Sequence, residues 1–537
     1  MNCTNRFAPC RRLALLLLLL ITATTVSFSQ DVLTYHDNNA RTGLNSHETT
    51  LTPANVNYNT FGKLFTLTVN GPVDAQPLYL SAVPVDGVTH NLLIVATELD
   101  TVYAFDADTG TLLWHVTTLG RGETPSDDRN CSFISPNIGI TATPAIARPA
   151  GTNGVIYVVP MSMDSSGNYY QRLHALDATS GKELYNGPVT ITATYPGTGD
   201  GSSGGHVTFD PAQYTERSAL LLTDGVLYLT WTSHCDIRPY TGWIMGYNPL
   251  TLAQETVLNI TPNGSQGAFW GAGAGPASDG LGNLFLLDAN GTFDTTLNSE
   301  GFPDQGDYGN AFLCLSTKGG LAVYDYFEMY NGQTESDDDV DLGSGGAIVI
   351  PDQKDANGKS WQLAAGAGKD GSIYIVDRTD MGKFNPNGNK IHQEISGSLG
   401  SGVFSTPAYF NKRIYFGPIN QPIMSFQFKN AKLKMQPVSQ TANKFPYPGA
   451  TPSISANEGM DGIVWAADNT DPAILYAYEA AGLTELYDTN QAPKGRDHFG
   501  SGNKFIAPLV INGKVYVGTT TGVGVFGLLS PKSPSGK

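Results

Sequence analysis

The chain has 537 residues, which is long for one ordinary domain, although single all-β domains reach this length. Hydrophobic residues make up 40% and charged residues only 15%, with 61 glycines and 32 prolines, and this composition favours many short strands over long helices. The formal net charge of −17 excludes nucleic acid and anionic lipid as expected partners.

The N-terminus has the three parts of a secretory signal peptide. Arg6, Arg11 and Arg12 precede or border the apolar run LALLLLLLI (13–21), and Ser27 and Ser29 lie at the −3 and −1 positions of a cleavage site before Gln30. The apolar run is too short for a spanning helix, and no later segment is long enough to cross a bilayer. We therefore predict a signal peptide at 1–29, a secreted or periplasmic protein, and no membrane span.

Three of the five cysteines lie after this segment. Cys131 and Cys235 stand in polar, loop-like stretches and form a candidate disulfide for an oxidising compartment, although spacing alone does not fix the pairing. Cys314 lies in the alternating stretch AFLCLS and is expected to be a buried free thiol.

A repeat then runs along the chain. A small or polar residue, usually followed by proline, opens a strand in eight places: AQPLYL (75–80), ATPAIA (142–147), RSALLL (217–222), AGPASD (274–279), SGGAIV (344–349), STPAYF (405–410), ATPSIS (450–455) and IAPLVI (506–511). Each is followed by further apolar strands and, in many cases, a polar turn, as in TVYAFDADTG and RLHALDATSG. Such units cannot bury both faces of their sheets alone, but stacking them around an axis does so.

The two ends of the chain predict how this ring closes. The last unit stops after GVGVFGLL (522–529), while FGKLFTLTV (61–69) is a strand that precedes the first unit. We therefore predict an all-β, eight-bladed β-propeller of four-stranded antiparallel blades, closed by the N-terminal strand joining the last blade. One domain would span 30–529, and a disordered tail would span 530–537.

The stretch VYAFDADTGTLLW (102–114) is explained by turn chemistry. Asp106 and Asp108 are expected to accept hydrogen bonds from turn amides, and Gly110 to supply a positive φ. Trp114 is expected to pack between adjacent blades. None of these residues requires a ligand.

The same stretch, with LHALDATSGKEL (173–184) and IYIVDRTDMG (373–382), resembles the repeat of the pyrroloquinoline-quinone (PQQ) family of propellers over about residues 60–529. The opening YHDNNARTGLN (35–45) also resembles secreted bacterial proteins of this repeat type. The family includes quinone-dependent alcohol and sugar dehydrogenases as well as non-catalytic scaffolds, so the resemblance implies the fold and leaves catalysis open.

In the dehydrogenases of this family, a quinone lies over a tryptophan, a calcium ion has Glu and Asn ligands, an Asp is the base, and a Lys or Arg touches the quinone. By resemblance, Trp270 and Lys369 would contact a quinone, Asn290 would bind a metal ion, and Asp339 or Asp341 would be the catalytic base. The order of these segments along the chain matches the family.

Several family features are missing. There is no adjacent cysteine pair and no haem-attachment Cys-x-x-Cys-His, and Glu216 does not stand in the context of the calcium-binding glutamate. Three of the candidate residues also have structural explanations, Trp270 as a blade contact and Asn290 and Lys369 as turn residues. The acidic run 337–341 lacks EF-hand spacing, because Gly343 falls one position late, and it is expected to be a solvated loop.

Two functions therefore remain open. The first is an exported binding or interaction scaffold whose central tunnel takes a small-molecule, carbohydrate or envelope-protein ligand, with no assured cofactor. The second is a dehydrogenase that uses PQQ with calcium to oxidise an alcohol or sugar at a reduced site.

Overall fold

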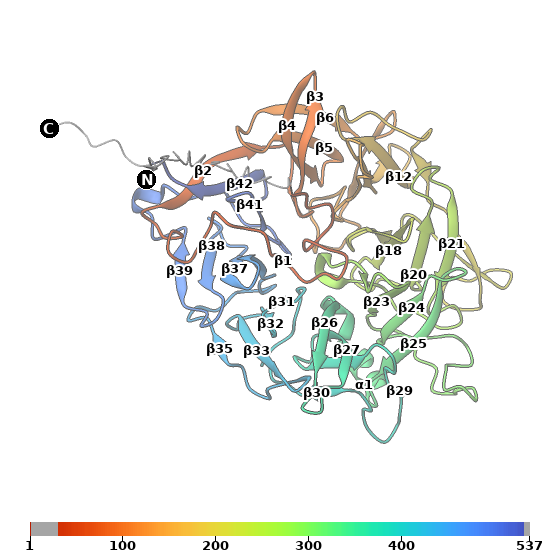
Figure 1. The fold of residues 1–537 in the computed structure, drawn as a ribbon. Helices are drawn as coiled ribbons and strands as arrows, with labels where there is room; N and C mark the ends of the chain where they lie inside the picture. Colours follow the sequence, from red (N-terminus) through yellow and green to blue (C-terminus); the bar gives the residue numbers. More distant parts are fainter. Residues whose placement is uncertain (2–29, 531–537) are drawn as a thin grey trace.

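The computed structural model describes residue 1 and residues 30–530, and it shows β-sheets arranged as a ring around a central axis (Figure 1). Residues 2–29 of the predicted signal peptide and residues 531–537 of the predicted tail lie outside the described residues. In residues 30–530 the only α-helix is the short α1 (Gly332–Asp337), and no helix is long and apolar enough to cross a membrane.

Seven blades follow one another along the chain, each built mainly from one stretch of sequence. The first blade contains β3 (Leu78–Val85), β4 (Val88–Thr97), β5 (Thr101–Asp106) and β6 (Leu112–Thr117). The second contains β9 (Ala145–Ala147), β10 (Val155–Val158), β12 (Tyr169–Asp177) and β13 (Val189–Thr190), extended by β7 (Glu123–Asp127), β8 (Asn137–Ile138) and β11 (Met161–Asp164). The third contains β17 (Leu221–Thr223), β18 (Val226–Thr230), β20 (Trp243–Tyr247) and β21 (Gln254–Asn259).

The next four blades repeat this order. Their strands are β22 (Ala277–Ser278), β23 (Asn283–Leu287), β24 (Phe312–Ser316) and β25 (Ala322–Glu328), with β29 (Lys383–Phe384); β26 (Ile348–Lys354), β27 (Ser360–Ala367), β28 (Ile373–Asp377) and β30 (Gln393–Ile395); β31 (Ala408–Phe410), β32 (Arg413–Phe416), β33 (Met424–Lys429), β34 (Lys432–Leu433) and β35 (Ser439–Gln440); and β36 (Ser453–Asn457), β37 (Met460–Ala467), β38 (Leu475–Glu479) and β39 (Glu485–Asp488), with β1 (Leu44–Asn45).

A further four-stranded sheet joins the two ends of the chain. It contains β40 (Leu509–Ile511), β41 (Lys514–Gly518), β42 (Gly522–Leu528) and β2 (Phe61–Thr68), and the predicted pairing of residues 61–69 with the last strand is present as the antiparallel pair β2–β42. Two small two-stranded sheets complete the β-structure: β14 (Thr194–Pro196) with β15 (His206–Thr208), and β16 (Tyr214–Thr215) with β19 (Thr232–Ser233).

The predicted fold class, an eight-bladed β-propeller of four-stranded antiparallel blades, is wrong in its number of blades, which is seven and not eight. Seven blades are built from successive stretches of chain, the sheets of these blades contain between four and seven strands, and the pairs β1–β36 and β25–β29 are parallel. The physical reason is that segments outside the repeat add to the sheets. β7, β8 and β11 extend the second blade, and β1 comes from the N-terminal segment.

The hydrophobic core lies between neighbouring sheets. One buried cluster joins Ile350 and Ile375 of the fifth blade to Ile414 and Phe426 of the sixth, and similar clusters lie at the other boundaries. Trp114 contributes to one such contact, as predicted, because its indole Nε1 donates to the carbonyl of Ala178 in the next blade at 3.1 Å.

The turn after β5 differs from its prediction in one residue. Asp106 accepts hydrogen bonds from the amides of Asp108 and Thr109 at 3.0 and 2.7 Å, as expected. Asp108 does not bond turn amides. Its carboxylate forms an ion pair with Lys514 at 2.7 Å, which ties the first blade to the sheet that joins the chain ends.

Residues 31–48, here named the axial segment, contact the first strand of each of the seven blades and of the sheet that joins the chain ends. They make hydrogen bonds, in chain order, to Tyr79, Ile146, Leu222, Ser278, Val349, Tyr409, Ile454 and Val510. Since these partners lie on β3, β9, β17, β22, β26, β31, β36 and β40, the axial segment contacts the innermost strand of each sheet and fills one end of the axis.

Arg41 is the most deeply embedded charge of this segment, with no exposed surface. Its guanidinium donates to the carbonyl oxygens of Pro276 at 3.0 Å, Leu220 at 3.1 Å and Tyr35 at 2.9 Å, and to Thr34 Oγ1 at 2.6 Å. Burial lowers the pKa of Arg41 to about 9, so the side chain remains charged at neutral pH. One side chain therefore joins two blades to the axial segment.

We predict that Arg41→Ala destabilises the protein by about 3 kcal/mol or more, because buried carbonyl oxygens of two blades lose their donor. Chemical denaturation of the wild type and the variant measures this change. Arg121→Ala, at an exposed site, is the control and should shift the free energy of unfolding by less than about 0.5 kcal/mol. Equal effects of the two substitutions would contradict a structural role for Arg41.

Candidate functional site

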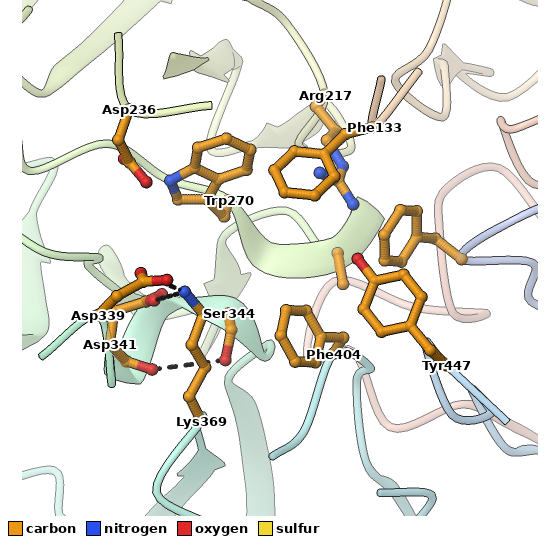
Figure 2. Close-up of a pocket in the computed structure, with 12 residues that line it drawn as sticks. Phe133, Arg217, Asp236, Trp270, Asp339, Asp341, Ser344, Lys369, Phe404 and Tyr447 are labelled. Carbon is orange, nitrogen blue, oxygen red and sulfur yellow. Dashed lines mark hydrogen bonds and ion pairs between the residues drawn. The ribbon is translucent and has the colours of Figure 1, made fainter. Parts of the chain in front are cut away.

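One pocket brings together side chains from several blades (Figure 2). It encloses about 440 Å³, including its opening to solvent, and is lined by Phe133, Arg217, Asp236, Trp270, Ala272, Asp339, Asp341, Ser344, Lys369, Phe404, Tyr447 and Phe505. We name it the axial pocket.

The position of this pocket follows from the repeat. Phe404, Tyr447 and Phe505 each stand four to six residues before the first strand of a sheet, and Arg217, Trp270 and Ser344 hold similar places in their own repeats. The axial segment contacts the same strands about five residues further along. The first strands thus run from the pocket towards the axial segment, so the predicted tunnel is closed at one end.

Four of the five residues predicted from the sequence line the axial pocket together: Trp270, Lys369, Asp339 and Asp341. The fifth, Asn290, lies just behind them. Its amide Nδ2 donates to Asp339 Oδ1 at 2.8 Å, while its Oδ1 is buried without a hydrogen-bond partner. The structure therefore brings the five residues to one place.

Lys369 lies between the two acidic residues of this group. Its Nζ is 2.5 Å from Asp339 Oδ1 and 2.6 Å from Asp341 Oδ1 (Figure 2). Burial alone would lower the pKa of Lys369, but the two carboxylates outweigh burial and raise it. The ammonium group therefore fills the space in which the two carboxylates would otherwise bind a cation together.

The two candidate bases differ in their surroundings. The side chain of Asp339 is 67% exposed, whereas that of Asp341 is 3% exposed. Burial raises the pKa of Asp341 to about 6, against the opposing effect of Lys369. Asp341 is thus the carboxyl group poised to exchange a proton near neutral pH. The prediction of a solvated loop for 337–341 holds for exposed Asp338 and Asp339, whereas Asp337 ends helix α1 and Asp341 is buried beside Lys369.

The opposite side of the pocket is aromatic and carries one positive charge. The guanidinium of Arg217 lies 3.9 Å from the ring centroid of Phe505 and 5.8 Å from that of Trp270. Phe133 meets Trp270 edge to face, with 5.6 Å between the ring centroids. Such flat apolar faces beside a guanidinium suit a planar ligand that carries negative charge.

The predicted disulfide between Cys131 and Cys235 is present and supports this wall, with 5.5 Å between the two Cα atoms. It joins the loop that carries Phe133 to the loop that carries Asp236, so two lining residues from different blades are held by one covalent bond. Cys314 is a buried free cysteine, as expected.

Sequence reasoning missed Arg217, Phe133 and the aromatic residues of the last three repeats. Arg217 directly follows Glu216, which the sequence did not match to a calcium ligand; the carboxyl oxygens of Glu216 are buried without partners, and Glu216 does not line the axial pocket. The sequence does carry one signal for these lining residues, because a large side chain recurs shortly before the first strand of successive repeats.

A calcium ion does not fit this arrangement as it stands. In residues 30–530 there is no group of three or more His, Cys, Asp and Glu side chains placed to hold a metal ion. Asn290, Asp339 and Asp341 offer oxygen atoms, but Lys369 lies between the two carboxylates. A calcium ion normally has six to eight oxygen ligands.

Comparisons with known proteins agree with the fold. Residues 62–207 match the PQQ_2 family model, described as outer membrane protein assembly factor BamB. The quinohemoprotein alcohol dehydrogenase from Comamonas testosteroni has a TM-score of 0.61 and 15% identity, over 94% of this chain and 82% of that chain. A europium-containing methanol dehydrogenase has a TM-score of 0.56 and 14% identity, over 92% of this chain and 90% of that chain. No curated protein sequence matches the chain.

These findings confirm the predicted PQQ-like repeat over residues 62–207, and the two solved structures show that the chain shares their β-propeller fold. At 15% identity or less, the solved structures show the shared fold and not a shared activity.

We predict that Lys369→Met makes stability more sensitive to pH. A buried acid with a raised pKa stabilises the fold at low pH, and this contribution is lost as pH rises from about 4 through its folded pKa, which is about 6 for Asp341. Without Lys369 that folded pKa rises further, so the melting temperature should fall more between pH 5 and pH 8 than in the wild type.

The control is the double variant Lys369→Met/Asp341→Asn, in which this extra pH dependence should disappear. If the single variant and the wild type show the same difference in melting temperature between pH 5 and pH 8, Lys369 does not stabilise the ionised form of Asp341.

Proposed function

We propose that the axial pocket binds a planar, negatively charged aromatic cofactor of the pyrroloquinoline-quinone type, and that the protein uses it to oxidise an alcohol or a sugar. One observation carries this proposal: the residues identified by resemblance to quinone enzymes, Trp270, Lys369, Asp339 and Asp341, line a single pocket. An exported location and a small-molecule substrate are part of the same proposal.

The pocket fits the quinone in shape and charge. Trp270 offers an aromatic face, and Arg217 and Lys369 offer positive charge on two sides of the pocket. Lys369 would supply the positive charge that calcium supplies in the calcium-dependent members of the family, so we propose no calcium-dependent step.

A bound quinone would accept two electrons and two protons from the substrate and would be reoxidised by an external electron acceptor. Side chains of this chain would bind the ligand and accept the substrate proton. Asp341 is positioned to accept the proton of a substrate hydroxyl group, since its pKa of about 6 leaves it mostly ionised at pH 7. Lys369, 2.6 Å away, stabilises this carboxylate. Trp270 and Arg217 orient the ligand.

A second candidate is a binding propeller without turnover. It is favoured by the Lys369 ion pairs, which leave no metal site, and by the exposed apolar side chains of Phe133 and Tyr447 at the pocket. In that case a carbohydrate or an envelope protein would contact the same end of the axis.

We predict that the purified protein binds added quinone and that Trp270→Ala and Arg217→Gln each weaken binding at least tenfold, because each removes a stacking or charge contact of about 1.4 kcal/mol. Quenching of tryptophan fluorescence and the absorbance of the bound quinone measure the affinity. Trp361→Ala is the matched control, since Trp361 lies outside the pocket and contacts Lys359 and His392. Unchanged affinity in both pocket variants would reject the site.

With quinone bound, we predict dye-linked oxidation of an alcohol or sugar whose kcat/KM rises with pH through about 6, as Asp341 loses its proton. Asp341→Asn should lower kcat/KM at least a hundredfold and retain the quinone. Binding of quinone without oxidation of any tested alcohol or sugar would favour the second candidate.

A further inference from the structure

A second pocket lies beside the axial pocket and shares Phe133 with it. It encloses about 340 Å³, including its opening to solvent, and its lining includes Asp74, Glu98, Ser132, Phe133, Ser135 and Lys504. We name it the carboxylate pocket. Asp74 lies between β2 and β3, Glu98 in the turn between β4 and β5, and Lys504 shortly before β40.

The inner wall of this pocket is Glu98, which is 1% exposed. Its Oε2 accepts hydrogen bonds from the amide of Gly139 at 2.7 Å and from Thr141 Oγ1 at 2.9 Å, so the carboxyl group is held in one orientation. Its Oε1 is buried and has no hydrogen-bond partner in the protein. A buried carboxylate oxygen without a partner is costly, unless a proton or a ligand occupies that position.

Asp74 lines the same pocket as Glu98, and burial together with the negative charge of Asp74 raises the pKa of Glu98. Asp74 Oδ2 accepts a hydrogen bond from the side-chain amide of Asn503 at 2.8 Å. Among the ion pairs of residues 30–530, none involves Asp74 or Glu98. Two facing carboxylates repel each other when both are ionised, so the pair needs a proton or a cation.

The nearest basic groups do not fill this role. Arg217 and Lys504 both lower the pKa of Asp74 through their charges, yet burial dominates and raises the pKa of Asp74 and of Glu98. The ammonium group of Lys504 lies 3.3 Å from the carbonyl oxygen of Ser132 and 3.5 Å from that of Phe133, and it forms no ion pair with either acid. The positive charge is at the edge of the pocket and not between the acids.

We propose that the carboxylate pocket binds one hydrated divalent cation, with Asp74 and Glu98 Oε1 as its direct protein ligands. Magnesium is commonly held by one or two carboxylates while it keeps several water molecules. Ser132 and Ser135 are exposed at this pocket, which leaves room for those waters. The proposal does not depend on quinone binding, because it uses neither Asp339 nor Asp341.

Manganese(II) is the probe. Its binding to the full chain is measured as the enhancement of water-proton relaxation by the bound ion. We expect one site in the wild type from which magnesium displaces manganese. Glu98→Gln and Asp74→Asn should each weaken binding at least tenfold. Asp100→Asn, which removes a buried, unpartnered carboxyl group two residues from Glu98 but outside the pocket, is the matched control and should bind manganese as the wild type does.

A variant that is expected to bind manganese more tightly distinguishes loss of the site from misfolding of the protein. Lys504→Met removes a positive charge near the site, and manganese affinity should rise several-fold at low ionic strength. Asp341→Asn should leave the affinity unchanged, which separates this site from the axial pocket.

The proposal is overturned if the wild type binds no manganese at millimolar concentration, since the pair then holds only a proton. It is also overturned if binding persists in both Glu98→Gln and Asp74→Asn, or if it is lost in Asp341→Asn. None of these results depends on whether the protein binds quinone.

Discussion

The structure depends on the contact between the axial segment and the first strand of every sheet. Residues 31–48 bond to each of these strands in turn, and the buried guanidinium of Arg41 donates to carbonyl oxygens of two blades. A ring of sheets has unpaired backbone groups facing its axis, and this segment satisfies them at one end. Gly43 is needed for its path: with φ at 64°, an added Cβ would lie 2.4 Å from His36 Nε2.

Closing one end of the axis decides where a ligand can bind. The residues that precede the first strands lie at the open end of the axis, and their side chains form much of the axial pocket. One side is aromatic with Arg217, and the other is acidic with Lys369 between Asp339 and Asp341. The disulfide between Cys131 and Cys235 joins the two loops that carry Phe133 and Asp236, and these loops form a wall of the pocket outside the repeat. The axial pocket and the carboxylate pocket thus lie at the end that the axial segment leaves free.

The sequence predicted more of this arrangement than its composition alone suggests. The eight recurring anchors each lead into the first strand of a sheet, and the pairing of residues 61–69 with the last strand is present, because alternating apolar patterns and turn residues are local signals. The eight blades of four strands were predicted wrongly: seven blades are present, and β1, β7, β8, β11 and β29, which come from segments without the repeat, extend some of their sheets. Arg217, the ion pairs of Lys369 and the role of residues 31–48 depend on contacts between distant parts of the chain, which no local pattern encodes.

We propose that the axis is closed at the axial segment and that its open end holds a planar ligand. A crystal structure of the protein with added pyrroloquinoline quinone tests it most directly. We expect electron density for one flat ligand against Trp270, within reach of Arg217 and Lys369, with residues 31–48 in place across the axis. Density for the ligand at any other site, or an axis open from end to end, would contradict it.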